Sequence, residues 1–413
     1  MRQYVRKRDV ALALTLLCVA AGPAAAQDGG LPTLAGRGVG WISSSGAWQV
    51  DFSGQLDIET YVPQDSPPWL IPTVDPFVAG RLRLFTDIFA GDHVYALVEL
   101  RADRGEAPTD ASVEARLEQA FVRLMPWPRA SVQLQAGKFA LPFGGYARRH
   151  HAIDDPFIRP PLAYDYRTLV APATVPRGQT GFLGWKNEAP ERRPEGAPPV
   201  WNVPYPWGGM LSASVGPLAM RAALASAAAS SASEEWGLDG DRLQSPSFTL
   251  GADYQLVPEL RLGLAWTRGP YLADIETGNL PQGTSESDFV QELLSAEAVF
   301  ERGRTTVRGE VFLDRWEVPN LDDDPVDVAW YAETRYDLTA GLFVAARWNE
   351  MRFNDLPLGD TKEAWDHDVR RIQIGAGYRI VQNSGVRAEY ALSRTDGIDP
   401  RDDLFALQWW WQF

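Results

Sequence analysis

The stretch DLFALQWWWQF, Asp403–Phe413, alternates in character with a period of two as far as the last residue. One set of alternate positions is apolar and mostly aromatic: Phe405, Leu407, Trp409, Trp411 and Phe413. The other set is Ala406, Gln408, Trp410 and Gln412. Successive side chains of a β-strand point to opposite faces, so this pattern predicts a strand. An aromatic face opposite a small or polar face is typical of a strand with lipid on one side.

Chain ends usually fray unless something holds them, so this aromatic end predicts a strand that is paired and covered. An ordinary buried edge strand is the alternative interpretation. The stretch resembles the C-terminal strand of bacterial outer-membrane β-barrels, in which the assembly machinery reads a terminal Phe and the alternating hydrophobic positions before it. This resemblance implies that Phe413, Trp411 and Trp409 form an assembly signal, with the barrel assembly machinery as a partner.

The start of the chain has the features of a secretory signal peptide. Residues 2–8 carry four basic side chains, Val10–Ala21 is an apolar run of twelve, and three alanines precede Gln27. The pattern predicts cleavage after residue 26, and the run is shorter than the roughly 20 residues that span a bilayer. The one cysteine, Cys18, lies inside this segment, so the mature chain would have no disulfide and no thiolate metal site. The formal net charge of −15 argues against nucleic acid as a partner.

The remaining residues, 27–413, show no linker that would divide them into domains and no apolar run of 18 residues. A closed barrel is the other structure that satisfies its own backbone in a membrane. The 16 Trp, 13 Tyr and 17 Phe match the aromatic girdles of such barrels. The composition therefore favours an all-β fold, a transmembrane antiparallel β-barrel.

About sixteen segments show the strand alternation. They are Trp48–Glu59, Val78–Ala90, His93–Asp103, Arg116–Met125, Ser131–Ala140, Gly208–Val215, Leu218–Ser226, Ser247–Leu256, Leu260–Arg268, Phe289–Glu301, Thr305–Trp316, Val326–Asp337, Leu342–Met351, Val369–Ile380, Val386–Arg394 and Asp403–Phe413. Within the Ala-rich pair, Ala222–Ala229 would also suit a helix on propensity. The connections alternate between short and long, the pattern of short periplasmic turns and long extracellular loops. Sixteen strands would enclose a water-filled lumen.

Inward-facing positions of these strands carry both charge signs. The arginines that we expect to line the pore are Arg81, Arg83, Arg101, Arg308, Arg335 and Arg347, and Arg371 and Arg387 also face inward. Inward carboxylates include Asp87, Glu99, Glu310, Asp327, Glu333 and Glu389. A dry core would not tolerate so many charges, so water is expected inside the barrel.

The sequence AGKFALPFGG, Ala136–Gly145, follows an AFVRL strand and precedes DDPFIRPPLAYDY, Asp154–Tyr166. These motifs resemble the porin O and P group of bacterial outer-membrane porins, some of which are phosphate-selective. The resemblance implies an outer-membrane channel for passive diffusion of small hydrophilic solutes or ions, a homotrimer, and contact with outer-membrane lipid and lipopolysaccharide. The small residues of Ala213–Ala229 are the one local hint of a trimer. Phosphate selectivity in the group also relies on lysines, and residues 27–413 hold only Lys138, Lys186 and Lys362.

The segment 141–207 is far longer than structureless connections usually are, so a function or fold of its own is expected. It is the third long connection, the place where porins fold a loop into the lumen. Its candidate pore-constriction residues are Arg148, Arg149, Asp154, Asp155 and Arg159. An external lid over the mouth is the alternative, and rings of charge at a narrowing favour the constriction.

The sequence shows little other chemistry. His150 and His151 beside Asp154 and Asp155 could bind a metal, but adjacent histidines lack the spacing of known sites. Neither G-x-S-x-G nor H-E-x-x-H occurs, so we expect no enzyme and no cofactor. A non-channel adhesin or scaffold barrel and a secreted, soluble, carbohydrate-binding β-protein remain as alternatives to the porin.

Overall fold

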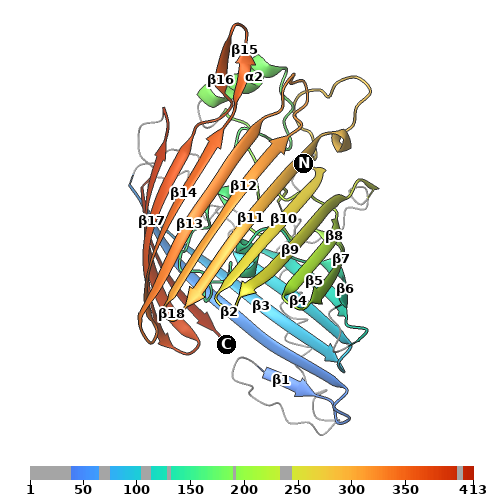
Figure 1. Cartoon of the computed structure of the whole chain (residues 1–413), viewed down its shortest axis with the longest axis vertical. Coiled ribbons are helices and arrows are strands. Elements are labelled where there is room, and N and C mark those ends of the chain that lie inside the picture. Colours follow the sequence, from blue (N-terminus) through green and yellow to red (C-terminus); the bar gives the residue numbers. More distant parts are fainter. Residues whose placement is uncertain are drawn as a thin grey trace.

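The computed structural model describes residues 39–64, 75–103, 113–127, 132–188, 192–232, 244–397 and 403–413. The signal peptide predicted for residues 1–26 lies outside these ranges. The described chain forms a closed barrel of tilted antiparallel strands (Figure 1). None of its helices is long and apolar enough to cross a membrane.

Sixteen strands form the barrel wall, in the order in which they occur along the chain. They are β2 (Trp48–Pro63), β3 (Phe77–Ala90), β4 (Val94–Asp103), β5 (Glu114–Leu124), β6 (Val132–Lys138), β7 (Trp207–Val215), β8 (Leu218–Ala225), β9 (Ser247–Val257), β10 (Leu260–Pro270), β11 (Val290–Arg302), β12 (Thr305–Trp316), β13 (Val326–Thr339), β14 (Leu342–Phe353), β17 (Val369–Val381), β18 (Ser384–Thr395) and β19 (Leu404–Gln412). Each predicted strand is present with ends shifted by a few residues, and the Ala-rich pair forms strands rather than a helix. The predicted barrel of about sixteen strands is confirmed.

Three further strands lie outside the wall count. β1 (Val39–Ile42) pairs with the first residues of β2, and β15 (Asp355–Leu358) forms a hairpin with β16 (Thr361–Ala364). Figure 1 places β1 at the end of the barrel that holds the C-terminus and the hairpin at the opposite end. None of the sixteen predicted strands covers β1 or this hairpin. Four residues are too few for an alternation to stand out, and pairing is what makes these segments strands.

The connections sort by length between the two ends of the barrel. The short turns share the end of the C-terminus, and the long connections share the end with β15 and β16 (Figure 1). Two of the short turns hold Gly91 at φ 56° and Gly216 at φ 56°, a left-handed conformation that glycine adopts without strain. Glycine therefore allows the chain to reverse within two or three residues.

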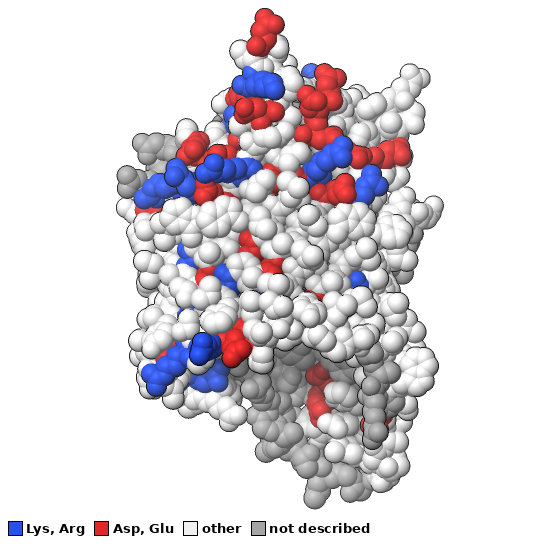
Figure 2. Space-filling view, viewed as in Figure 1, with Lys and Arg blue, Asp and Glu red and all other residues white. Residues whose placement is uncertain are grey.

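The outer wall is apolar because of the strand alternation. On β12, Val307, Val311 and Leu313 are exposed, whereas Glu310 and Phe312 between them are buried. Figure 2 shows the result on one face, a broad belt of mostly uncharged side chains between groups of charged side chains above and below. An apolar belt with charged borders is the surface that a barrel presents to a bilayer.

The barrel closes at the pairing of β19 with β2, which we call the seam. The Phe413 amide donates to the Gly54 carbonyl at 3.0 Å, and the Gly54 amide donates to the Phe413 carbonyl at 2.8 Å. A Cβ atom on Gly54 would lie 2.4 Å from the Phe413 ring, so a larger residue there would displace the ring. The ring also packs on Trp411, with centroids 4.9 Å apart. The last aromatic residue thus contacts both strands of the seam; its role as an assembly signal stays a prediction.

Candidate functional site: the lumen

The connection between β6 and β7, residues 139–206, packs against the inner wall of the barrel. It contains the short helices η2 (Tyr146–Arg148), η3 (Leu162–Tyr164), α2 (Gln179–Gly184) and η4 (Trp185–Asn187). Its aromatic side chains Phe143, Tyr164 and Tyr166 are buried in one cluster with wall residues such as Phe312 and Tyr331. The rings of Tyr164 and Phe312 meet edge to face with centroids 5.4 Å apart. Among the described residues, this segment and the wall it contacts therefore form the largest apolar core.

Glu310 of β12 holds the start of the segment. Its buried carboxylate accepts hydrogen bonds from the Gly145 amide at 3.0 Å and from the Tyr164 and Tyr331 hydroxyls, each at 3.1 Å. A Cβ atom on Gly145 would lie 2.0 Å from a carboxylate oxygen of Glu297. A larger residue at this position, the last of the AGKFALPFGG motif, would therefore displace the Glu297 carboxylate.

A buried charge cluster holds the middle of the segment. Asp155 contacts Arg149 at 3.2 Å and Arg347 of β14 at 3.1 Å. Glu333 of β13 contacts the same two arginines, at 3.3 Å and 2.7 Å. The Arg347 guanidinium also lies over the Phe157 ring, 4.3 Å from its centroid. Two arginines and two carboxylates therefore neutralise one another between segment and wall, as burial of charge requires.

The next turn of the segment contacts β17 and β18. The Ile158 amide donates to Glu389 at 2.6 Å, and the Arg371 guanidinium donates to Asp165 at 2.9 Å. Arg159 also pairs with Asp165, and its side chain is buried. The predicted constriction residues Arg149, Asp155 and Arg159 thus lie in contacts that fix the position of the segment.

The wall formed by β2 to β5 carries a second network, in which wall residues pair with one another. Arg83 contacts Asp57 at 3.0 Å, and Arg101 contacts Glu118 at 2.9 Å. These four side chains are buried. Arg81, which pairs with Asp103 at 3.1 Å, is the more exposed member of its pair. Cross-strand neighbours on one face lie close enough for such pairing without help from another segment.

Exposure differs between the two partners of the inner ion pairs. The side chains of Arg81, Arg148, Arg261 and Arg308 are 26, 33, 31 and 16% exposed. Their partners Glu59, Glu297 and Glu333 are 4, 5 and 1% exposed. The order is reversed for Arg335 with Asp337, at 26% against 48%, and for Arg308 with its second partner Glu301, at 16% against 61%. It is also reversed for Arg159 and Arg371 with Asp165, at 7% and 0% against 19%. The inner surface therefore presents the guanidinium rather than the carboxylate at the pairs of Arg81, Arg148 and Arg261 with Glu59 and Glu297.

The structure divides the residues that were predicted to line the pore. Arg81, Arg148, Arg308, Arg335 and Asp154 are at least partly exposed, whereas Arg83, Arg101, Arg149, Asp155, Arg159 and Arg347 are buried. Sequence reading missed the inner cluster in which Asp253 contacts Arg148, Arg221 and Arg261. The strand alternation could have identified these two arginines as inward-facing. Arg221 is next to the exposed Met220, and Arg261 is next to the exposed Leu262.

The histidine pair of the segment is packed rather than arranged as a metal site. The His150 ring nitrogens contact the Ala147 carbonyl at 2.8 Å and the Tyr205 hydroxyl at 2.9 Å, so one nitrogen donates and the other accepts. Burial lowers the pKa of His150 to about 3, and burial likewise lowers the pKa of His151. Within the described ranges no three His, Cys, Asp or Glu side chains are grouped to hold a metal ion.

Solved structures with a similar fold are outer-membrane proteins. OmpT, an outer membrane protein of Vibrio cholerae, is 12% identical with a TM-score of 0.57, over 89% of this chain and 98% of that chain. The outer membrane channel DcaP of Acinetobacter baumannii is 10% identical with a TM-score of 0.55, over 90% and 99%. An anion-selective porin from Comamonas acidovorans is 10% identical with a TM-score of 0.55, over 89% and 100%.

No protein-family model and no curated protein matches the sequence. At 10 to 12% identity, the likeness to the solved structures shows the fold alone. The chain has the architecture of outer-membrane porins: a closed antiparallel barrel of sixteen strands.

Proposed function

We propose that the protein is an outer-membrane porin, a non-enzymatic, water-filled channel for passive diffusion of small hydrophilic solutes and ions. The apolar outer belt supports a position in the membrane, in contact with lipid and lipopolysaccharide. Partly exposed charges on the inner face support a wet lumen, because charges of that number would not be stable in a dry interior. Two structural neighbours are described as a channel or a porin, which agrees with this function.

We further propose that the channel prefers small anions. The observation that carries this proposal is the exposure of the inner arginines over their more buried carboxylate partners. Charged side chains at a pore surface select ions of the opposite sign. Any phosphate selectivity would have to rest on these arginines, since Lys138 is fully buried, Lys186 pairs with Glu363, and Lys362 lies in β16 outside the barrel wall.

We propose that the segment 141–207 narrows the lumen rather than forming an external lid. Its contacts with inward-facing Glu310, Glu333 and Arg347 support this position. Arg148 is then the segment residue that meets the permeating ion, because its guanidinium is partly exposed while it contacts Asp253 at 2.8 Å.

Planar-bilayer recording tests the channel and the role of Arg148 together. Arg148→Ala should leave a conducting channel but shift the reversal potential in a salt gradient toward cations, because Asp253 and Glu297 would lose a shielding charge. Arg352→Ala is the matched control, since Arg352 is 69% exposed at the long-loop end and pairs with Glu350. An unchanged reversal potential in Arg148→Ala would contradict the role, and absence of wild-type conductance would contradict the channel.

We propose a homotrimer as the functional form. The strands β6 and β8 have only 7 and 8 residues. At about 3.4 Å per residue and a tilt near 45°, they rise less than the apolar band of about 25 Å, so a neighbouring subunit is needed to cover this wall. One structural neighbour is described as a trimer form of OmpT. Native mass in mild detergent tests this, and a monomer would contradict it.

A further inference from the structure

A cavity of about 320 Å³ lies at the short-turn end of the barrel, beneath the segment 139–206. The residues that line it from the segment are Ala152, Ile153 and Asp155. Those from the turns and strand ends are Arg304, Arg335, Asp337, Thr339, Ala340, Gly341, Phe343, Tyr378, Arg379, Val386, Arg387 and Trp410. None of the contacts that support the channel proposal uses Arg304, Arg379 or Trp410.

Both carboxylates of the cavity already have arginine partners. Asp337 accepts two hydrogen bonds from Arg335, at 3.1 Å and 3.0 Å. Asp155 contacts Arg149 and Arg347, which lie outside the cavity lining. Other arginines therefore already neutralise the two carboxylates of the cavity, and the positive charges of Arg304, Arg379 and Arg387 are additional to them.

These three arginines keep donors that can reach a ligand. In the part of the chain that the structure describes, the Arg379 guanidinium has neither a hydrogen bond nor an ion pair. Arg304 donates one hydrogen bond, to the Leu338 carbonyl at 3.1 Å, which leaves its other nitrogens available. Arg387 donates to the Asp155 carbonyl, and its buried Nε has no partner. A buried donor without a partner is uncommon in proteins and indicates a missing acceptor.

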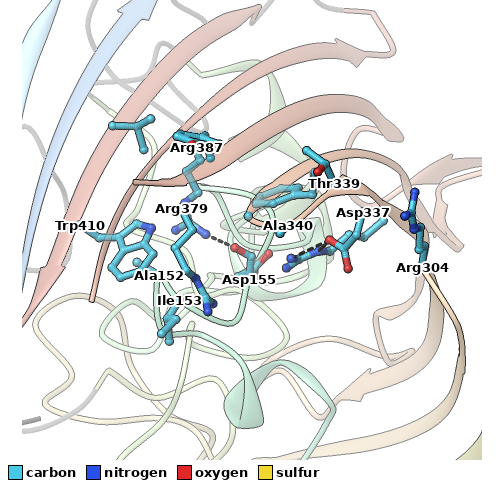
Figure 3. Close-up of a pocket in the computed structure, with 15 residues that line it drawn as sticks. Ala152, Ile153, Asp155, Arg304, Asp337, Thr339, Ala340, Arg379, Arg387 and Trp410 are labelled. Carbon is cyan, nitrogen blue, oxygen red and sulfur yellow. Dashed lines mark hydrogen bonds and ion pairs between the residues drawn. The ribbon is translucent and has the colours of Figure 1, made fainter. Parts of the chain in front are cut away.

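The cavity also has an apolar side. Figure 3 shows Trp410, Ala152 and Ile153 near Arg379, with Arg304 and Asp337 on the opposite side. Across the cavity, the Arg335 guanidinium lies over the Phe343 ring at 4.2 Å, so this ring is held in place. The cavity therefore offers cationic donors and an aromatic, apolar surface to the same ligand.

We infer that this cavity binds a small organic anion, with its carboxylate or phosphate group on the free arginines and a compact apolar body against Trp410. Guanidinium groups match the oxygen geometry of both anionic groups. The volume is at the lower end of ligand pockets, so the body is about the size of one ring. This inference rests on the proposed channel function. It adds a solute-binding site at the short-turn end of that channel.

Calorimetric titration of the full chain in detergent tests the site without any need for conduction. The probes are phenyl phosphate and benzoate, with inorganic phosphate as the anion without a ring and benzyl alcohol as the ring without a charge. The wild type should bind both aromatic anions more tightly than either reference compound. The double variant Arg304→Gln, Arg379→Gln should bind them at least about tenfold more weakly, because charge-assisted hydrogen bonds are lost. Whichever of phenyl phosphate and benzoate binds more tightly shows whether the site prefers a phosphate or a carboxylate group.

The matched control is the double variant Arg352→Gln, Arg370→Gln, which removes the same charge from exposed arginines at the long-loop end. Its affinity should equal that of the wild type. Equal affinity in the Arg304/Arg379 variant, equal weakening in the control, or binding of inorganic phosphate as tight as that of phenyl phosphate would each overturn the inference. Conductance of the same samples separates the two proposals: a conducting protein without binding refutes the site alone, and binding without conductance refutes the channel alone.

Discussion

The barrel has two inner walls that use the same residue types in different ways. Along β2 to β5, arginines and carboxylates pair across neighbouring strands, as Arg83 does with Asp57 and Arg101 with Glu118. Along β12 to β18, wall charges instead contact the segment 139–206, as Glu333 and Arg347 do with Arg149 and Asp155. The first wall pairs these charges between its own strands, and the second pairs them with the segment.

Buried ion pairs therefore have two structural roles in this barrel. A pair within a wall fixes neighbouring strands, while a pair between wall and segment fixes the shape of the lumen. The cost of leaving a buried charge unpaired is several kcal/mol in either place. The segment is therefore held by the pairing of its buried charges with wall charges, and we expect the two walls to respond differently when one arginine is removed.

The largest expected effect is at the seam, where β19 joins the second wall to the first. Deletion of Phe413 removes both backbone hydrogen bonds to Gly54 and the ring that fills the space above it. We expect the yield of folded, heat-modifiable barrel in membranes to fall several-fold. Phe405→Ala is the matched control, an outward-facing aromatic residue on the same strand, and should have a smaller effect. Wild-type yield after the deletion would remove the role of Phe413 in assembly.

A direct test of the comparison removes one buried arginine from each wall. Arg347→Ala leaves Asp155 and Glu333 with less compensation, and Arg83→Ala does the same to Asp57 and Glu99. Each should lower the free energy of unfolding by about 3–5 kcal/mol, measured by urea titration in detergent.

The two variants should differ in the mobility of the segment. Limited proteolysis should cut within residues 139–206 faster in Arg347→Ala than in the wild type, because a contact between segment and wall is lost. Arg83→Ala should show the wild-type cleavage rate there, since its partners are wall residues. Equal cleavage in the two variants would mean that the walls do not differ in this way.

The smallest expected effect concerns pH. Burial holds the pKa of His150 near 3, well below the usual value of about 6.5, so the ring stays neutral in the folded protein at pH 5. Stability is therefore full above pH 6.5 and falls as the unfolded state takes up a proton below it, by at most about 1.4 kcal/mol per pH unit. His150→Gln should make the slope of unfolding titrations between pH 7 and 4.5 shallower, because only His151 then contributes in this way. Conductance over that range should show no histidine step, and a step lost in His150→Gln would contradict the buried, neutral ring.

Much of the fold can be predicted from the sequence, because the alternation of side chains along a strand shows which positions face outward and which face inward. Alternation places Phe405 and Leu407 outside and Ala406 and Gln408 inside without knowledge of any partner strand. The structure agrees at all four residues. The same rule gave the sixteen strands and the inward direction of Arg83 and Arg347. It missed β1 and the β15–β16 hairpin, which have four residues in each strand and depend on their pairing partners.

The lumen could be predicted only in part. Sequence identified 141–207 as an unusual connection and named its charges, but not which of them would be exposed. Arg148 is 33% exposed and the adjacent Arg149 is buried, although both are arginines in one loop. Arg149 meets Glu333, and Arg347 meets Asp155 192 residues away in sequence. The sequence by itself determined the strands, the two faces of the wall and the closed barrel, because periodicity is a local property. The tertiary structure alone decided which charges pair, which face the lumen and where a cavity is left, because those depend on strand register and on where the long segment packs.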